Sequence, residues 1–172
     1  MASGRRPPGP VGGVTTMADL MAGFAADTLR RCDLLRGFSD ELILELATRS
    51  TERFCDPGET IFEIGAPATS VYAVESGRIN LVLPLPDGHE INVRDVGPGE
   101  VFGWMALVEP RRFSGTARCA HESAIVEMPA SDLEAVFVRN PAKGYSVMQR
   151  VATMVAAWLG DTQAQLIAAL AD

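Results

Sequence analysis

The chain has 172 residues, a formal net charge of −7 and a sequence pI near 4.8. Hydrophobic residues make up 47% and charged residues 22%, which is typical of a soluble globular protein. The acidic balance argues against a nucleic-acid-binding surface, which is usually basic, and no apolar run is long enough to cross a membrane. The length predicts a single domain.

Cysteine usage and the N-terminus indicate the compartment. Cys32, Cys55 and Cys119 are far apart and show no CxxC spacing, so we expect free buried thiols in a reducing environment. Arg5 and Arg6 are followed by Pro and Gly instead of an apolar segment, which argues against a secretory signal. We therefore expect a cytoplasmic protein.

The first 50 residues of the chain divide into a tail and two helices. Residues 1–16 are rich in Gly and Pro and are predicted to be a disordered tail, followed by one domain over residues 17–172. Apolar residues recur at three- and four-residue spacing, which predicts N-terminal helices within residues 17–50. Ser39 is a good N-cap for the second of them.

Between residues 53 and 129, short β-branched and aromatic segments alternate with Gly, Pro and Asp turns. Asp87-Gly88 is a strong hairpin signal. The pattern predicts strands near 59–64, 70–75, 78–84, 89–96, 115–120 and 123–129. Such spacing favours a jelly-roll-like β-roll, a double-stranded β-helix, so the fold class is mainly β with flanking α-helices.

Helical spacing returns over residues 130–172. Ser131 and Asp132 are predicted to cap a short helix that extends through Phe137. Asn140-Pro141 should end it and begin a long C-terminal helix, with a break possible at Gly160. One stripe of that helix carries apolar residues that we expect to pair with a second copy in a homodimer: Met148, Val151, Val155, Trp158, Leu166 and Leu170.

The segment from Phe102 onward has the features of an anion site. A glycine lets the backbone approach a ligand, a short helical turn presents free N–H groups, and arginines and small residues follow. This pattern predicts a phosphate or another small anion held on backbone amides. The candidate residues are Phe102, Gly103, Trp104, Met105, Ala106, Arg111, Arg112, Phe113, Ser114 and Thr116.

Four motifs, taken in order, resemble the cyclic-nucleotide-binding domains of the catabolite-activator/FNR type. They are Pro57–Phe62, Gly65, Val71–Gly77 and Gly97–Gly103, and the resemblance covers residues 34–160. It implies a β-roll with a phosphate-binding cassette. Only DTQAQLIAALAD follows Gly160, which leaves no room for a recognition helix, so we expect a divergent branch without a helix-turn-helix domain and no DNA binding.

The cassette departs from the family pattern at two positions. The resemblance puts a ribose-binding glutamate where this chain has Trp104, and a phosphate-binding arginine where it has Phe113. An indole nitrogen only donates, so it cannot accept a hydrogen bond from a ribose hydroxyl. Three alternatives stay open: an altered anionic, nucleotide-like or phosphorylated ligand that uses Arg112 or Arg111, a vestigial pocket, and ordinary cAMP or cGMP binding.

Catalysis has little support. His89 and His121 stand alone, and no metal-ligand spacing is present, so we expect no enzyme and no metal. The leading expectation is a non-catalytic regulatory or sensor module that binds a small anion at the modified cassette. The alternative is a ligand-free adaptor that contacts a partner protein.

Overall fold

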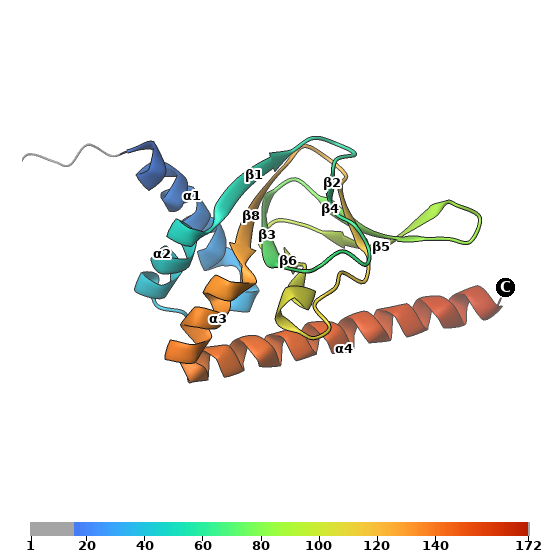
Figure 1. Cartoon of the computed structure of the whole chain (residues 1–172). Coiled ribbons are helices and arrows are strands. Elements are labelled where there is room, and N and C mark those ends of the chain that lie inside the picture. The colour runs from blue at the N-terminus through green and yellow to red at the C-terminus, as the bar shows by residue number, and fades with distance from the viewer. Residues whose placement is uncertain (1–15, 172) are drawn as a thin grey trace, which may run out of the picture.

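The computed structural model describes residues 16–171, in which a β-roll stands between two helical segments (Figure 1). The N-terminal helices are α1 (Met17–Arg31), the 3₁₀ turn η1 (Asp33–Leu35) and α2 (Asp40–Arg49). The strands are β1 (Thr51–Cys55), β2 (Thr60–Phe62), β3 (Ser70–Ser76), β4 (Ile79–Pro84), β5 (Glu90–Val96), β6 (Val101–Phe102), β7 (Thr116–Cys119) and β8 (Ser123–Pro129). The remaining helices are η2 (Trp104–Leu107), α3 (Ala130–Arg139) and α4 (Pro141–Ala171).

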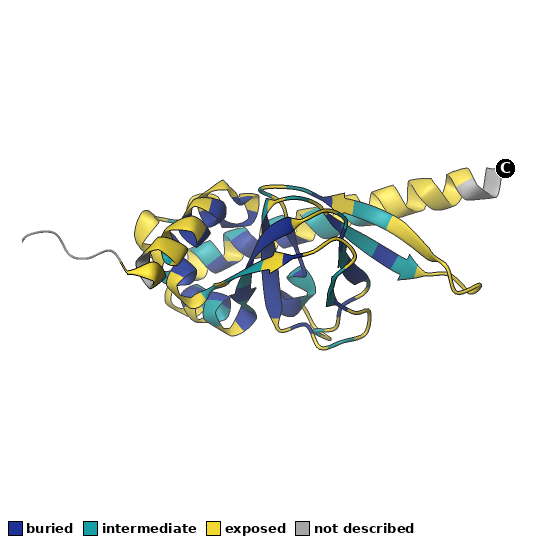
Figure 2. Cartoon of the chain, turned by 90° about the horizontal axis from the view of Figure 1, so that it is seen from above, coloured by how far each residue is buried: buried dark blue, intermediate teal, exposed yellow. Residues whose placement is uncertain are grey.

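The strands form two antiparallel sheets whose inner faces make the core. Their orders are β1-β8-β3-β6 and β2-β7-β4-β5. Apolar side chains of β3 and β8 are almost completely buried, among them Val71, Val74 and Ile125 (Figure 2). This is the jelly-roll-like β-roll with flanking helices that the sequence predicts.

Two strands were absent from the sequence-based prediction. β1 pairs with β8 over its whole length, but its exposed Phe54 and its polar neighbours break the alternation that marks a half-buried strand. β6 has only two residues and pairs with β3. The predicted hairpin at Asp87-Gly88 is confirmed: Gly88 has a φ of 85°, and Leu85 donates to the carbonyl of His89.

The helix ends confirm one predicted cap and correct another. The Ser39 hydroxyl accepts a hydrogen bond from the amide of Leu42 at 3.4 Å, as expected for an N-cap. The predicted cap at Ser131 is wrong, because α3 begins at Ala130, whose amide donates to the Thr69 carbonyl. Asp132 lies inside the first turn and pairs with Arg49.

Helix α4 runs along the roll and then extends past it (Figure 1). Val147 and Val151 are buried where α4 packs near α3 and η1, whereas the distal half of α4 is exposed (Figure 2). The helix is continuous through Gly160, so the predicted break is not observed. Residues 141–171 contain no helix-turn-helix motif, and no helix within residues 16–171 is both long and apolar enough to span a bilayer.

The predicted disordered tail at residues 1–16 lies outside the described residues, apart from Thr16. The Thr16 carbonyl accepts a hydrogen bond from the amide of Leu20 and so belongs to the start of α1. The side chain of Leu170 also lies outside the described residues.

Candidate functional site

The cassette turns at a glycine that no other residue could replace without strain. Gly103 is the N-cap of η2 and adopts the left-handed conformation, with φ 74° and ψ 16°. A Cβ atom added there would lie 2.9 Å from the Tyr72 ring and 3.2 Å from the Ser70 carbonyl oxygen. The glycine therefore allows β6 to pass close to β3 and to turn directly into η2.

Phe113 fills the interior of the roll. Its side chain is only 4% exposed, and its ring stacks on that of Phe62 with centroids 3.6 Å apart and an interplanar angle of 8°. Phe62 also contacts the rings of Tyr72 and Phe102 at 5.6 and 5.9 Å. The residue at the position of the family's phosphate-binding arginine is thus part of a buried aromatic cluster.

The two cassette arginines are directed away from this cluster. Phe113 exchanges backbone hydrogen bonds with Gly65 and Ala66, and neighbouring residues of an extended segment point to opposite faces. Phe113 therefore points inward and Arg112 outward, where its guanidinium donates to the Gly65 carbonyl at 2.8 Å. The structure does not bring Arg112 to the interior.

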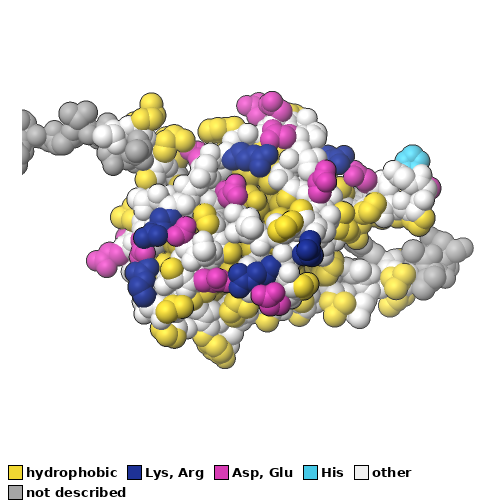
Figure 3. All heavy atoms as spheres, viewed as in Figure 1, with side chains coloured by type: hydrophobic (Ala, Val, Ile, Leu, Met, Phe, Trp, Pro, Cys, Tyr) yellow, Lys and Arg dark blue, Asp and Glu magenta, His cyan; other side chains and the backbone are white. Residues whose placement is uncertain are grey.

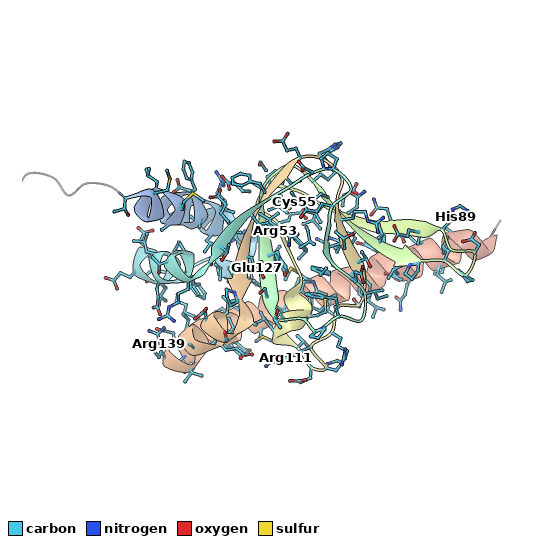
Figure 4. The ribbon with its side chains drawn as sticks, turned by 45° about the horizontal axis from the view of Figure 1, so that its top comes forward. Arg53, Cys55, His89, Arg111, Glu127 and Arg139 are labelled. Atoms are coloured by element: carbon cyan, nitrogen blue, oxygen red, sulfur yellow. The ribbon has the colours of Figure 1, made fainter. Side chains whose placement is uncertain are left out.

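Arg111 has a structural partner on α3. It adopts a positive φ of 53°, and its guanidinium donates to Glu134 at 2.6 Å and to Glu109 at 3.0 Å. The hydrogen bond to Glu134 is the main cause of a raised Arg111 pKa. Figure 4 shows Arg111 on the outer side of η2, away from the roll interior. Neither arginine of the cassette is available to an anion inside the roll.

The space that remains beside the cassette is small. A cavity of about 40 Å³ lies between the roll, η2 and α4. Ligand sites for small molecules are usually about 300–1,000 Å³, so this cavity holds water-sized groups only. Its walls include five of the predicted residues: Phe102, Gly103, Trp104, Met105 and Ser114.

The other predicted residues support the backbone instead. Ala106 is completely buried, and Thr116 is 7% exposed. The Thr116 hydroxyl accepts a hydrogen bond from the amide of Ile64 at 3.1 Å. These side chains hold the cassette against the roll.

The predicted ligand residues do not include the other eight residues of the cavity wall, of which two carry a polar or charged group that could contact a ligand. Arg94 on β5 and Trp158 on α4 both line the cavity. Arg94 carries the only basic side chain among the cavity-lining residues that the structure describes. No local motif marks either residue, because β5 and α4 reach the cassette only once the roll has closed.

The predicted dimer residues separate onto two faces of α4, which corrects the single stripe. Val151 is 2% exposed and belongs to the core, and Trp158 faces the roll cavity. Of the predicted set, Met148 and Leu166 are 38% and 59% exposed, and Val155 is partly buried against the core. Leu159, which the predicted set does not include, is 52% exposed. At about 100° per residue, Val151 and Trp158 lie roughly 60–80° around the helix from Met148 and Leu166, so one edge of the stripe meets the core and the other is exposed.

Other reactive groups lie outside the cavity. The three cysteines are free and buried, as predicted, and burial raises the pKa of the Cys32 thiol to about 11. His89 lies at the tip of the β4–β5 hairpin (Figure 4). Within the described residues, no group of three or more His, Cys, Asp or Glu side chains could hold a metal ion. Figure 3 shows acidic and basic side chains mixed on one face.

Comparison with known proteins assigns the class that this fold and cassette indicate. The family profile named cyclic nucleotide-binding domain matches residues 52–140. The chain therefore belongs to the cyclic nucleotide-binding domain family, whose members are typical regulatory modules.

Individual proteins share sequence or fold with this chain. The chain is 31% identical to human patatin-like phospholipase domain-containing protein 6 over 129 residues, which are 70% of this chain and 9% of that protein. The N-terminal domain of a transcriptional regulator from Streptomyces coelicolor A3(2) is 28% identical, with a TM-score of 0.65 over 80% of this chain and 95% of that one. A cyclic nucleotide-binding domain from Methylobacillus flagellatus KT shares the fold, with a TM-score of 0.70 at 16% identity over 87% and 84% of the two chains.

Proposed function

We propose that the chain is a non-catalytic regulatory module that acts through protein contacts as a homodimer, and that its cassette does not bind cyclic nucleotides. The observation that carries the proposal is the Phe113 ring, buried and stacked on Phe62 at the position of the family's arginine. The cavity of about 40 Å³ supports it, since a nucleotide needs several times that volume. The three buried free thiols fit a reducing compartment such as the cytoplasm.

The exposed face of α4 supports a homodimer. Residues spaced in steps of four and three follow a heptad pattern there: Met148, Ala152, Val155, Leu159, Thr162 and Leu166. All are exposed except Val155, which is partly buried against the core. Leu159 and Leu166 are 52% and 59% exposed, on a part of α4 that extends beyond the roll. We call these heptad residues the seam. Helix α4 of a second copy would cover the seam.

Calorimetry with cAMP and cGMP tests the cassette. The unmodified chain should show no binding in the micromolar range, because the ribose acceptor and the phosphate-binding arginine are both replaced. Each replaced group removes a charge-assisted hydrogen bond that contributes roughly 1.5–3 kcal/mol, or at least about tenfold in affinity. Low-micromolar cAMP binding by the unmodified chain would refute the proposal.

Substitution on the exposed face tests the dimer. Leu159→Asp places a charge in the seam and should shift the sedimenting species from dimer to monomer. Val138→Asp is a matched control, because Val138 is 80% exposed on α3, outside the seam. Equal dimer populations in both variants would contradict the proposed interface.

A small-ligand sensor is the second candidate. The left-handed Gly103 and the position of Trp104 at the cavity favour it, since they keep the shape of an anion-binding turn. Expansion of the cavity would be required first. A ligand-dependent rise in melting temperature that Trp104→Ala abolishes would favour this candidate over the first.

A further inference from the structure

A second and larger cavity lies behind the turn that joins β5 to β6. Its volume is about 320 Å³, within the range of small-molecule sites. Three parts of the chain meet there: the segment around η1, the end of the β-roll and α4. We call it the arginine cleft, and its principal residues are Arg36, Arg94, Arg150, Asp33, Glu100 and Met154.

The three arginines come from three separate elements and are held in different ways. Arg150 on α4 donates to the carbonyl of Leu34 at 3.0 Å, which fixes its part-buried guanidinium beside η1. Arg94 on β5 donates to Glu100 at 3.3 Å, and its side chain is 31% exposed. Arg36 follows η1 and pairs with Asp33.

The carboxylates of the cleft do not neutralise it. Glu100 uses one oxygen for Arg94 and the other for the amide of Gly97, so it is occupied by the turn. Asp33 pairs with Arg36, and its side chain is 82% exposed, so it lies at the rim of the cleft. Arg150 has no carboxylate partner among residues 16–171. A chain of net charge −7 thus concentrates three guanidinium groups against two carboxylates in one cavity.

We propose that the arginine cleft binds a small phosphate-bearing molecule. Guanidinium groups offer planar pairs of N–H donors that match phosphate oxygens. Each guanidinium of the cleft donates to one described acceptor, which leaves further N–H groups of Arg36, Arg94 and Arg150 for a ligand. A tetrahedral phosphate presents several oxygens to donors that arrive from different directions, whereas a planar carboxylate presents two. The apolar wall at Met154 suits a carbon skeleton attached to the phosphate.

A ligand in this cleft would join the η1 segment, the roll and α4. Because Arg150 lies on the proximal part of α4, two residues before the exposed seam residue Ala152, the bound anion would fix this part of α4 against the roll. The roll cavity shares only Arg94 and Val101 with the cleft. None of the cassette residues 103–116 lines the cleft, so this inference holds whether or not the cassette binds a nucleotide.

Calorimetry and thermal shift with three probes test the proposal: inorganic pyrophosphate, glucose 6-phosphate and citrate, at constant ionic strength. The full chain is compared with Arg150→Gln and Arg36→Gln. Arg78→Gln is the matched control, because Arg78 is a half-exposed arginine that pairs with Asp95 outside the cleft. Arg36 is 73% exposed, so its variant should fold even if Arg150→Gln does not.

At least one phosphate probe should bind the unmodified chain with a dissociation constant below about 1 mM. Each cleft variant should weaken it about tenfold or more, and Arg78→Gln should leave it unchanged. Comparing the affinities for pyrophosphate and glucose 6-phosphate shows whether the cleft prefers an inorganic diphosphate or a phosphate monoester. Three outcomes would overturn the proposal: no binding of either phosphate probe, an equal loss in Arg78→Gln, or citrate binding as tight as that of the phosphate probes.

Discussion

Replacing Phe113 with alanine tests whether this side chain is part of a packed interior or lines an open ligand pocket. The Phe113 side chain is 4% exposed and stacks on Phe62 at 3.6 Å, so its removal leaves a void inside an aromatic cluster. Phe→Ala substitutions in cores cost about 3–5 kcal/mol. In a domain of this size, about 4 kcal/mol corresponds to a fall in melting temperature of about 8–16 °C. Thermal unfolding followed by circular dichroism measures this shift directly.

Phe54→Ala is the control for Phe113→Ala. Phe54 is 68% exposed on β1, and its loss should change the free energy of unfolding by about 0.5 kcal/mol at most. A residue that only awaits a ligand would behave like this control in the absence of ligand. If Phe113→Ala and Phe54→Ala melted within 2 °C of each other, the filled interior would be refuted.

Two further substitutions test the raised pKa of Glu52 and the strained turn at Gly103. Burial and the neighbouring Glu75 raise the pKa of Glu52 above its ordinary value of 4.5. Between the unfolded and folded pKa values, the folded state therefore holds a proton that the unfolded state releases, and the free energy of unfolding falls as the pH rises through this range. Glu52→Gln should therefore increase the free energy of unfolding in urea at about pH 7.5 and have no effect at about pH 3, with exposed Glu63→Gln as an unaffected control. Gly103→Ala combines a φ of 74° with a Cβ that would lie 2.9 Å from Tyr72, so it should destabilise the fold by at least about 1 kcal/mol, and unchanged unfolding would contradict the strained turn.

Much of the fold could be predicted from the sequence because local signals determine it. Asp87-Gly88 forms a hairpin wherever alternating strands flank it, and Ser39 caps a helix through its own neighbours. β1 could not be predicted, because its strand conformation depends on pairing with β8 and not on its own polar pattern. The start of α3 likewise depends on the Thr69 carbonyl, which lies far away in the sequence.

The site was less predictable, because the direction of its side chains depends on strand pairing and on closure of the roll. The sequence shows that Phe113 replaces an arginine and that Arg112 is adjacent. Only pairing with residues 65–66 determines which of the two points inward. Helical spacing alone does not show that Trp158 faces the roll while Leu159 faces away. Arg94 reaches both cavities from a strand without a recognisable motif.

Sedimentation equilibrium of the unmodified full chain, with and without saturating cAMP, tests the central claim most directly. A regulatory homodimer with a filled cassette should show twice the chain mass of 18.4 kDa at micromolar concentration, and cAMP should leave that mass unchanged. A species of single-chain mass, or a mass that changes when cAMP is added, would contradict the account.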